Sequence, residues 1–185
     1  MADSGSEPSA AASDARAVDD VRALAARTAA SLTADGARDE ALADFVPARR
    51  VLGFQRQPAM APRGRVWRLG VFLLSADGSL HATGAITRAV EPGHPGHVAV
   101  SSEERRAQRA AAFRGPFERG ETVNFGTAPI ELSPEALRDA DGPLFVRGGR
   151  ALVRWNAALD DDAAADFATY LAERADLLLH PPEGA

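Results

Sequence analysis

Alanine is the residue that most limits what this chain can fold into. It supplies 40 of the 185 residues, whereas Leu, Ile, Val and Phe together number 39. These larger apolar residues are therefore about 21% of the chain, just above the range typical of disordered proteins. Because an alanine side chain buries little apolar surface, we expect a thin core, concentrated in a few elements.

The basic residues exclude several kinds of chemistry. All 21 are Arg, and the chain has no Lys and no Cys. Without an amine that can lose its proton there is no Schiff base, pyridoxal attachment, Walker-type phosphate loop or Ser-Lys nucleophile pair. Without a thiol there is no thiolate catalysis, disulfide, zinc ribbon or Cys-ligated iron–sulfur cluster. We expect no cofactor.

Charge is distributed unevenly along the chain. The net charge is -5 for residues 1–45, +6 for residues 46–76, zero for residues 77–159 and -6 for residues 160–185. The total of -5 argues against a nucleic-acid partner, because nucleic-acid-binding domains are usually basic. The acidic ends are able to neutralise the basic middle.

The start of the chain and its apolar runs indicate where the protein resides. No apolar run approaches the roughly 18 residues needed to cross a bilayer, and residues 1–15 lack the basic and apolar regions of a secretory signal. We expect a soluble, cytoplasmic protein with no membrane contact. We further expect a disordered tail over 1–15, one domain over 16–180 and a tail over 181–185.

The strongest local signal is a hairpin between Val66 and Val90. Two β-type runs flank Asp77-Gly78, a pair that suits a two-residue turn. With that turn, the residue numbers of two cross-strand partners add up to 155. Trp67 then lies opposite Arg88, where a cation–π contact is expected. A second hairpin is predicted over residues 144–155, and a single strand over residues 122–131.

Helical periodicity and capping residues predict the remaining elements. A small-residue stripe at Ala107, Ala110 and Ala111 would let the central helix approach a sheet closely. The helical N-terminal part covers 16–46, followed by a basic connector over 47–64. The predicted helices are Asp14–Ala34, Asp39–Phe45, Ser101–Gly115, a short one at Pro134, and Asp161–Leu178.

These elements predict an α+β domain with two layers. Two hairpins and one strand form an antiparallel sheet of about five strands, which helices cover. The chain shows no alternating βαβ units, so we do not expect a parallel sheet.

Three polar residues on the predicted sheet are candidates for catalysis. His81 would act as a general base, with Glu121 or Asn124 fixing its tautomer. The alternative is a half-exposed sheet face that carries polar residues where water touches it, and we favour this alternative.

The same hairpin offers a candidate ligand site. Thr83, Thr87, Arg68 and Arg88 would bind a small anion, since a few Arg suffice for a carboxylate or phosphate. A separate group of Arg residues over 49–68, interleaved with aromatic residues, is typical of nucleic-acid contact.

Two clusters have residue types that metals use. His94 and His97 are three residues apart in a Pro- and Gly-rich loop without a rigid scaffold, which favours a solvated loop. Asp160, Asp161 and Asp162 suit the positive end of the last helix better than a magnesium site. We expect no metal site.

Five segments of the chain resemble a known group of proteins. They are RVWRLGVFLLSADGSLHATGAITRAVEPG, SSEERRAQRAAAFRG, GETVNF, GPLFVRGGRALVRW and YLAERADLLL. Over about residues 49–180 the chain is similar to small uncharacterised actinobacterial proteins, some of which are labelled glutaminase. Known glutaminases use a Ser-x-x-Lys pair or a Cys nucleophile, so glutamine hydrolysis here would follow an unrelated route.

We therefore predict a non-catalytic binding or interaction module for a small anionic ligand or another protein. One alternative is an amide hydrolase that uses His81 with Glu121 or Asn124. The other is nucleic-acid contact through the Arg segment 49–68.

Overall fold

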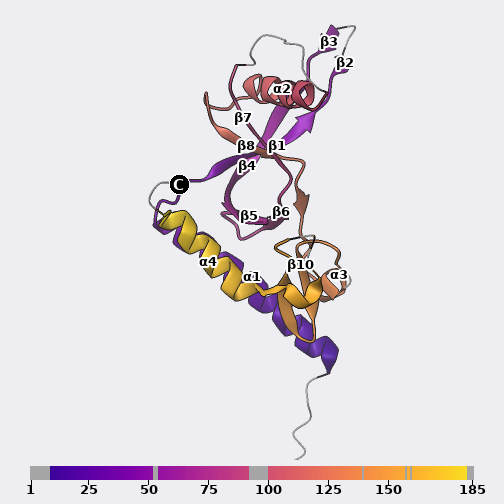
Figure 1. The fold of residues 1–185 in the computed structure, drawn as a ribbon, viewed down its shortest axis with the longest axis vertical. Coiled ribbons are helices and arrows are strands. Elements are labelled where there is room, and N and C mark those ends of the chain that lie inside the picture. Colours follow the sequence, from indigo (N-terminus) through magenta and orange to yellow (C-terminus); the bar gives the residue numbers. More distant parts are fainter. Residues whose placement is uncertain are drawn as a thin grey trace, which may run out of the picture. The chain divides into compact units, whose positions relative to one another are not determined.

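The computed structural model describes residues 9–51, 54–91, 100–138, 140–156, 158 and 160–182. Contacts divide the chain into two compact units. Unit 1 consists of Met1–Ala37, Leu69–Ala82 and Pro129–Ala185, and unit 2 of Arg38–Arg68 and Thr83–Ala128. Each unit is described by itself (Figure 1), and the single domain over 16–180 stays a prediction.

The α+β class is confirmed, but the predicted sheet is wrong. The described strands form a seven-stranded mixed sheet in the order β7-β8-β1-β4-β5-β6-β9, and two small sheets, β10-β11-β12 and β2-β3. One pair in the large sheet, β1 with β8, is parallel. The prediction has a mostly antiparallel sheet of about five strands, because it takes two segments that are strands for a helix and a connector.

Unit 2 holds one long helix, α2 (Val100–Phe113), beside its strands. The strands are β1 (Glu40–Val46), β2 (Arg49–Val51), β3 (Phe54–Arg56), most of β4 (Ala59–Leu69), β7 (Ala85–Arg88) and β8 (Thr122–Phe125). The predicted central helix is thus confirmed, whereas the predicted helix over 39–45 is strand β1. Three consecutive residues of β1, Ala41, Leu42 and Ala43, are buried. A strand covered on both faces lacks the alternation that identifies strands in a sequence.

The predicted basic connector over 47–64 is also a correction. It forms the β2-β3 ribbon and the first half of β4. β4 pairs antiparallel with β1, and the register shifts so that Leu42 faces Gly64 while Ala43 faces Pro62. This irregularity is a β-bulge, the position in a strand where Pro and Gly are tolerated. Pro and Gly therefore mark a bulge in this segment, not a loop.

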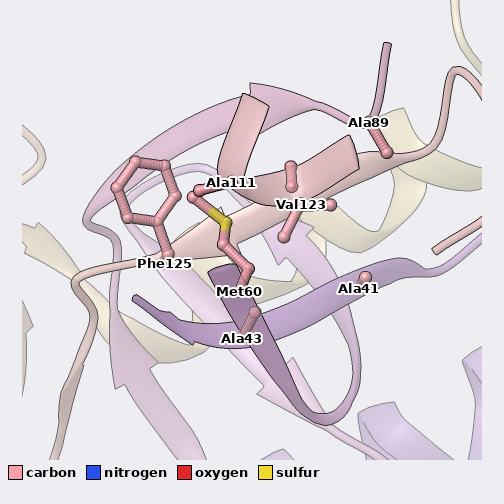
Figure 2. Close-up of a cluster of buried hydrophobic side chains, with 8 residues drawn as sticks. Ala41, Ala43, Met60, Ala89, Ala111, Val123 and Phe125 are labelled. Carbon is pink, nitrogen blue, oxygen red and sulfur yellow. The ribbon is translucent and has the colours of Figure 1, made fainter. Parts of the chain in front are cut away.

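Small side chains let α2 pack on the strands of unit 2. The core cluster joins five alanines to three larger residues, Met60, Val123 and Phe125, and Phe117 packs against it. Figure 2 shows the Met60 side chain extending toward Ala111. Of the predicted stripe, Ala111 is buried with its neighbour Ala112, but Ala107 is exposed. The expectation of a thin core holds for this unit.

The first predicted hairpin is shorter than expected and has a different register. β5 (Phe72–Ser75) pairs with β6 (Leu80–Ala82) so that Leu73 faces His81. Paired positions therefore sum to 154, because the turn has three residues and ends on Gly78 at φ +84°. Upstream, Gly70 at φ +64° breaks the run between β4 and β5. The predicted pairing of Trp67 with Arg88 is wrong, since Arg88 faces Thr122 on β8.

Glycine also divides the predicted strand over 122–131. The segment forms β8 and the two-residue β9 (Ala128–Pro129), separated at Gly126, which has φ +61°. Beside it, a Cβ on Gly84 would collide with the carbonyl oxygens of Phe125 and Gly126. β7 and β8 depend on this close approach of two backbones.

Unit 1 combines helices with the second hairpin. Its elements are α1 (Ala10–Ala34), β5, β6, α3 (Pro134–Arg138), β10 (Leu144–Arg147), β11 (Arg150–Val153), a 3-10 turn (Asp161–Ala163), β12 (Ala165–Asp166) and α4 (Phe167–Leu179). The structure confirms three predicted elements, which are the first helix, the short helix and the second hairpin. α1 begins at Ala10, four residues before the predicted start at Asp14. α1 and α4 lie side by side (Figure 1). The Phe72 ring meets Phe167 and Tyr170 edge-on at 5.8 and 5.9 Å.

The last helix begins later than predicted. Asp161 lies in the 3-10 turn, and the helix cap is Asp166, whose carboxylate accepts hydrogen bonds from the Ala168 and Thr169 amides. The three aspartates at 160–162 therefore do not begin α4. Asp161 instead pairs with Arg147 and Arg154.

Candidate functional site

Asn124, a predicted catalytic residue, is fully buried at the centre of a polar network in unit 2. Its Oδ1 accepts a hydrogen bond from Arg68, and its Nδ2 donates to Glu40 Oε2 at 2.8 Å and to the Ala41 carbonyl at 3.2 Å. Arg68 Nε lies 3.6 Å from Glu40 Oε2. Both amide protons and the amide oxygen are thus engaged, which is what a buried Asn requires.

Glu121, the second candidate, belongs to a second polar network, which is centred on Arg65. Arg65 donates to Glu121 Oε1 and, at 2.7 Å, to Asp39 Oδ1. Hydrogen bonding to Asp39 is the largest cause that raises the pKa of Arg65 above its ordinary value, and Glu121 adds to it. The other oxygen of Glu121 accepts the amide of Glu118 at 2.9 Å. The Glu121 carboxylate therefore joins β4 to the turn before β8, and Arg65 joins both to Asp39 at the start of β1.

The side chains of Arg65 and Arg68 reach over β1 on opposite faces of the sheet. Paired residues of adjacent strands share a face, and successive residues alternate. Arg65 faces Ala41, whereas Glu40 faces Val66. Arg68, two residues after Val66, therefore lies on the Glu40 face. β1 is thus bridged from β4 to β8 on both of its faces.

His81, the predicted base, belongs to unit 1. It lies on β6 opposite Leu73, with 8% of its surface exposed. Glu121 and Asn124 belong to unit 2, where each carboxylate or amide is engaged by an arginine. Within the hairpin of His81, the amide of Ser79 is the main cause that lowers the pKa of Asp77. The proposed catalytic roles of these three residues stay predictions.

A cavity of about 440 Å³ lies in unit 2 between β7, β8, the start of β1 and α2. Two predicted ligand-binding residues, Thr87 and Arg88, line it. The other two, Arg68 and Thr83, are not among the lining residues, although Arg68 contacts Glu40, which is. The full lining is Glu40, Ile86, Thr87, Arg88, Val90, Arg105, Gln108, Arg109 and Thr122.

Helix α2 contributes three lining residues that the sequence interpretation missed. Arg105, Gln108 and Arg109 are spaced i, i+3 and i+4, so they share one face of the helix. That spacing was visible in the sequence, where this side had been interpreted as solvated. The spacing points to a binding site only because this face of α2 packs beside β7.

The cavity lining carries more positive than negative charge. It has three arginines and one carboxylate, Glu40. That carboxylate already contacts Arg68 and Asn124. Neither Arg88 nor Arg109 forms an ion pair or side-chain hydrogen bond with another described residue. An entering anion would therefore meet the Arg88 and Arg109 guanidinium groups, which form no ion pair with another described residue.

The structure identifies no metal centre in the part of the chain that it describes, where no three His, Asp or Glu residues gather. His94 and His97 lie outside the described residues. Each described helix is too short or too polar to span a bilayer.

Comparison with known proteins gave no match. No family model, curated protein or solved structure is significantly similar to this chain. The resemblance to glutaminase-labelled proteins thus stays a prediction.

Proposed function

We propose that this protein binds a small anionic ligand, a carboxylate or a phosphate, in the cavity of unit 2. The observation that carries the proposal is the excess of arginine over acid in the lining. Arg88 and Arg109 come from different elements and enclose one space of about 440 Å³, within the usual range for small-ligand sites. Guanidinium groups bind carboxylates and phosphates through paired, charge-assisted hydrogen bonds.

The other lining groups support the same class of ligand. Thr87, Thr122 and Gln108 offer neutral hydrogen-bonding groups, and Ile86 and Val90 offer apolar surface. A ligand with an anionic group and a small apolar part would engage both. No group in the lining is proposed as a nucleophile or general base, so binding without turnover is the function proposed.

Calorimetric titration with inorganic phosphate and with citrate tests the proposal. Arg109→Gln and Arg88→Gln should each weaken binding of the anion roughly tenfold, as expected for loss of a hydrogen bond to a charged group. Arg27→Gln is the matched control, because Arg27 is an exposed helical arginine in unit 1. Equal affinities in wild type and both cavity variants would refute the proposal.

The β2-β3 ribbon supports a second candidate, contact with a nucleic acid. Arg49 lies directly opposite Arg56 in the ribbon, and like charges in that position repel. Phe54, on the same ribbon, is 79% exposed. Phosphates would relieve the repulsion and a base would stack on the ring, as in single-strand binding. In contrast, Arg63, Arg65 and Arg68 contact acidic residues.

Retention on immobilised single-stranded DNA tests this second candidate. We expect retention at low salt that disappears at moderate salt, because few phosphates are contacted. Arg49→Gln with Arg56→Gln should abolish it, whereas Arg27→Gln should not. Absence of retention at low salt would rule out this candidate.

The amide-hydrolase alternative has its own assay. Ammonia release from glutamine is compared in wild type and His81→Ala. Turnover that is lost in the variant would support hydrolysis and contradict a binding-only function.

A further inference from the structure

We propose that the anion bound in this cavity is the acidic side chain of an extended peptide, which adds a strand to the free edge of β7. This inference rests on the proposed function and names its ligand. β7 is the first strand in the order of the seven-stranded sheet, so β8 is its only neighbour among the described strands. Strand addition is a common mode of peptide recognition at such edges.

The backbone of β7 presents hydrogen-bonding groups on its outer side. Just after β7, the Ala89 amide donates to the carbonyl of Glu121, the residue before β8, at 2.9 Å. Because an antiparallel ladder alternates, Thr87 and Ala85 also direct their backbone groups toward β8, whereas Ile86 and Arg88 direct theirs outward. The Arg88 carbonyl accepts from the Val90 amide. The outward groups are therefore the amide and carbonyl of Ile86 and the amide of Arg88.

The cavity follows this same edge. Ile86, Thr87, Arg88 and Val90 all line it, and the arginine-bearing face of α2 forms the facing wall. A strand added at β7 would therefore lie between a backbone edge and a row of guanidinium groups. Alternate side chains of a strand point to opposite faces, so a peptide that alternates acidic and apolar residues fits. Its apolar side chains would contact Ile86, which is 51% exposed.

The opposite end of the sheet differs in a way that supports the assignment. β9, the last strand in the order, has only two residues, and one of them is Pro129. Proline and short length are the usual means of blocking an edge strand. β7 has four residues and no proline. Arg88 supplies charge at this edge, which discourages pairing with a neutral strand and attracts an acidic one.

Ile86→Pro tests the pairing directly. Proline at this position removes an outward amide without removing a hydrogen bond to β8, and proline is tolerated at such edge positions. The probe is an acetylated hexapeptide that alternates valine and aspartate, labelled for fluorescence anisotropy. We expect roughly tenfold weaker peptide binding to Ile86→Pro than to Ile86→Val, which keeps both the outward amide and an apolar side chain.

N-methylated peptides provide a test that does not depend on how the variant folds. In a strand, alternate amides point to opposite edges. Methylating one alternate set should abolish binding to the wild-type protein, and methylating the other set should leave it intact. Equal binding of both methylated peptides would overturn strand addition.

The outcomes separate this inference from the proposed function. Phosphate binding without binding of the aspartate peptide would leave the anion site standing and refute the peptide ligand. Peptide binding that depends on the Ile86 amide, without phosphate binding, would support strand addition and refute the small-anion function. A peptide with asparagine in place of aspartate should bind at least tenfold more weakly, and equal binding of the two would refute the role of charge.

Discussion

Arg68 on β4 donates a hydrogen bond to Asn124 on β8, across the full width of β1. The acceptor is fully buried and also engages Glu40. Replacing Asn124 would leave two charged groups without their shared neutral partner. Substitutions in this network therefore test how much it contributes to the stability of unit 2.

Asn124→Ala should lower the free energy of unfolding of unit 2 by about 2 to 4 kcal/mol, since buried charged groups lose hydrogen bonds. Trp67 is a buried reporter in unit 2, and Trp155→Phe removes the chain's other tryptophan. Urea unfolding is followed by Trp67 fluorescence in that background. Gln55→Ala, at an exposed position of β3, should change the value by less than about 0.5 kcal/mol.

Glu40→Gln should have opposite effects on ligand affinity and on stability. Removing the only acid of the cavity lining should tighten binding of inorganic phosphate by roughly threefold, the size of a partly screened charge interaction. The same change weakens the contact with Arg68 and should destabilise unit 2 by about 1 kcal/mol. Calorimetry and urea unfolding measure the two effects. Weaker phosphate binding in Glu40→Gln would contradict this assignment of the cavity.

Gly84→Ala should destabilise the β7-β8 pair severely. The added Cβ would meet carbonyl oxygens of Phe125 and Gly126, which are backbone atoms that cannot rotate away. We expect a loss of about 2 to 4 kcal/mol in urea unfolding of unit 2. Gly142→Ala is the matched control, because nothing lies near its added Cβ. A loss below about 0.5 kcal/mol for Gly84→Ala would show that the two backbones are further apart.

Acid should weaken unit 1 through Asp161. Hydrogen bonds from Arg154, and then from Arg147, hold the pKa of Asp161 below its ordinary value of 3.8. A depressed folded-state pKa stabilises the fold above the unfolded pKa, and this contribution is lost as the pH falls through the folded value. The urea midpoint, followed by Trp155 fluorescence in a Trp67→Phe background, should thus fall as the pH drops below about 4.

Asp161→Asn should flatten that part of the pH profile. The variant cannot lose a proton there, so its midpoint should be lower than that of wild type at neutral pH and converge with it in acid. Asp162→Asn is a suitable control, because Asp162 is the exposed neighbouring carboxylate. A constant difference between wild type and Asp161→Asn at every pH would contradict the role of the carboxylate charge.

Local signals predicted the elements that depend on local interactions. The helix at Ala10–Ala34 follows from its apolar spacing, the helix at Val100–Phe113 from its capping residues, and the second hairpin from Gly148-Gly149. β1 could not be found in this way, because its burial on both faces requires β4 and β8 as neighbours. The register of the first hairpin failed by one residue, since Asp-Gly suits both a two-residue and a three-residue turn.

The candidate site was predictable only in its residue types. Thr87 and Arg88, two of the predicted ligand-binding residues, are neighbours on one strand and both line the cavity; that they bind a ligand stays a prediction. Arg105 and Arg109 are distant from them in sequence, and only the packing of α2 beside β7 brings them near. Asn124 and Glu121 were chosen for their chemistry, but each is engaged by an arginine 56 residues earlier in the chain. No local pattern reports such a partner.

That separation of 56 residues has a consequence during synthesis. At typical translation rates the ribosome needs roughly 3 to 11 s to make so many residues. For that time Arg65 and Arg68 have emerged with the acids of β1 but without their partners on β8. The nascent chain thus presents both guanidinium groups without Glu121 and Asn124 while it is still attached to the ribosome, and these partners arrive only when the segment around β8 has been made.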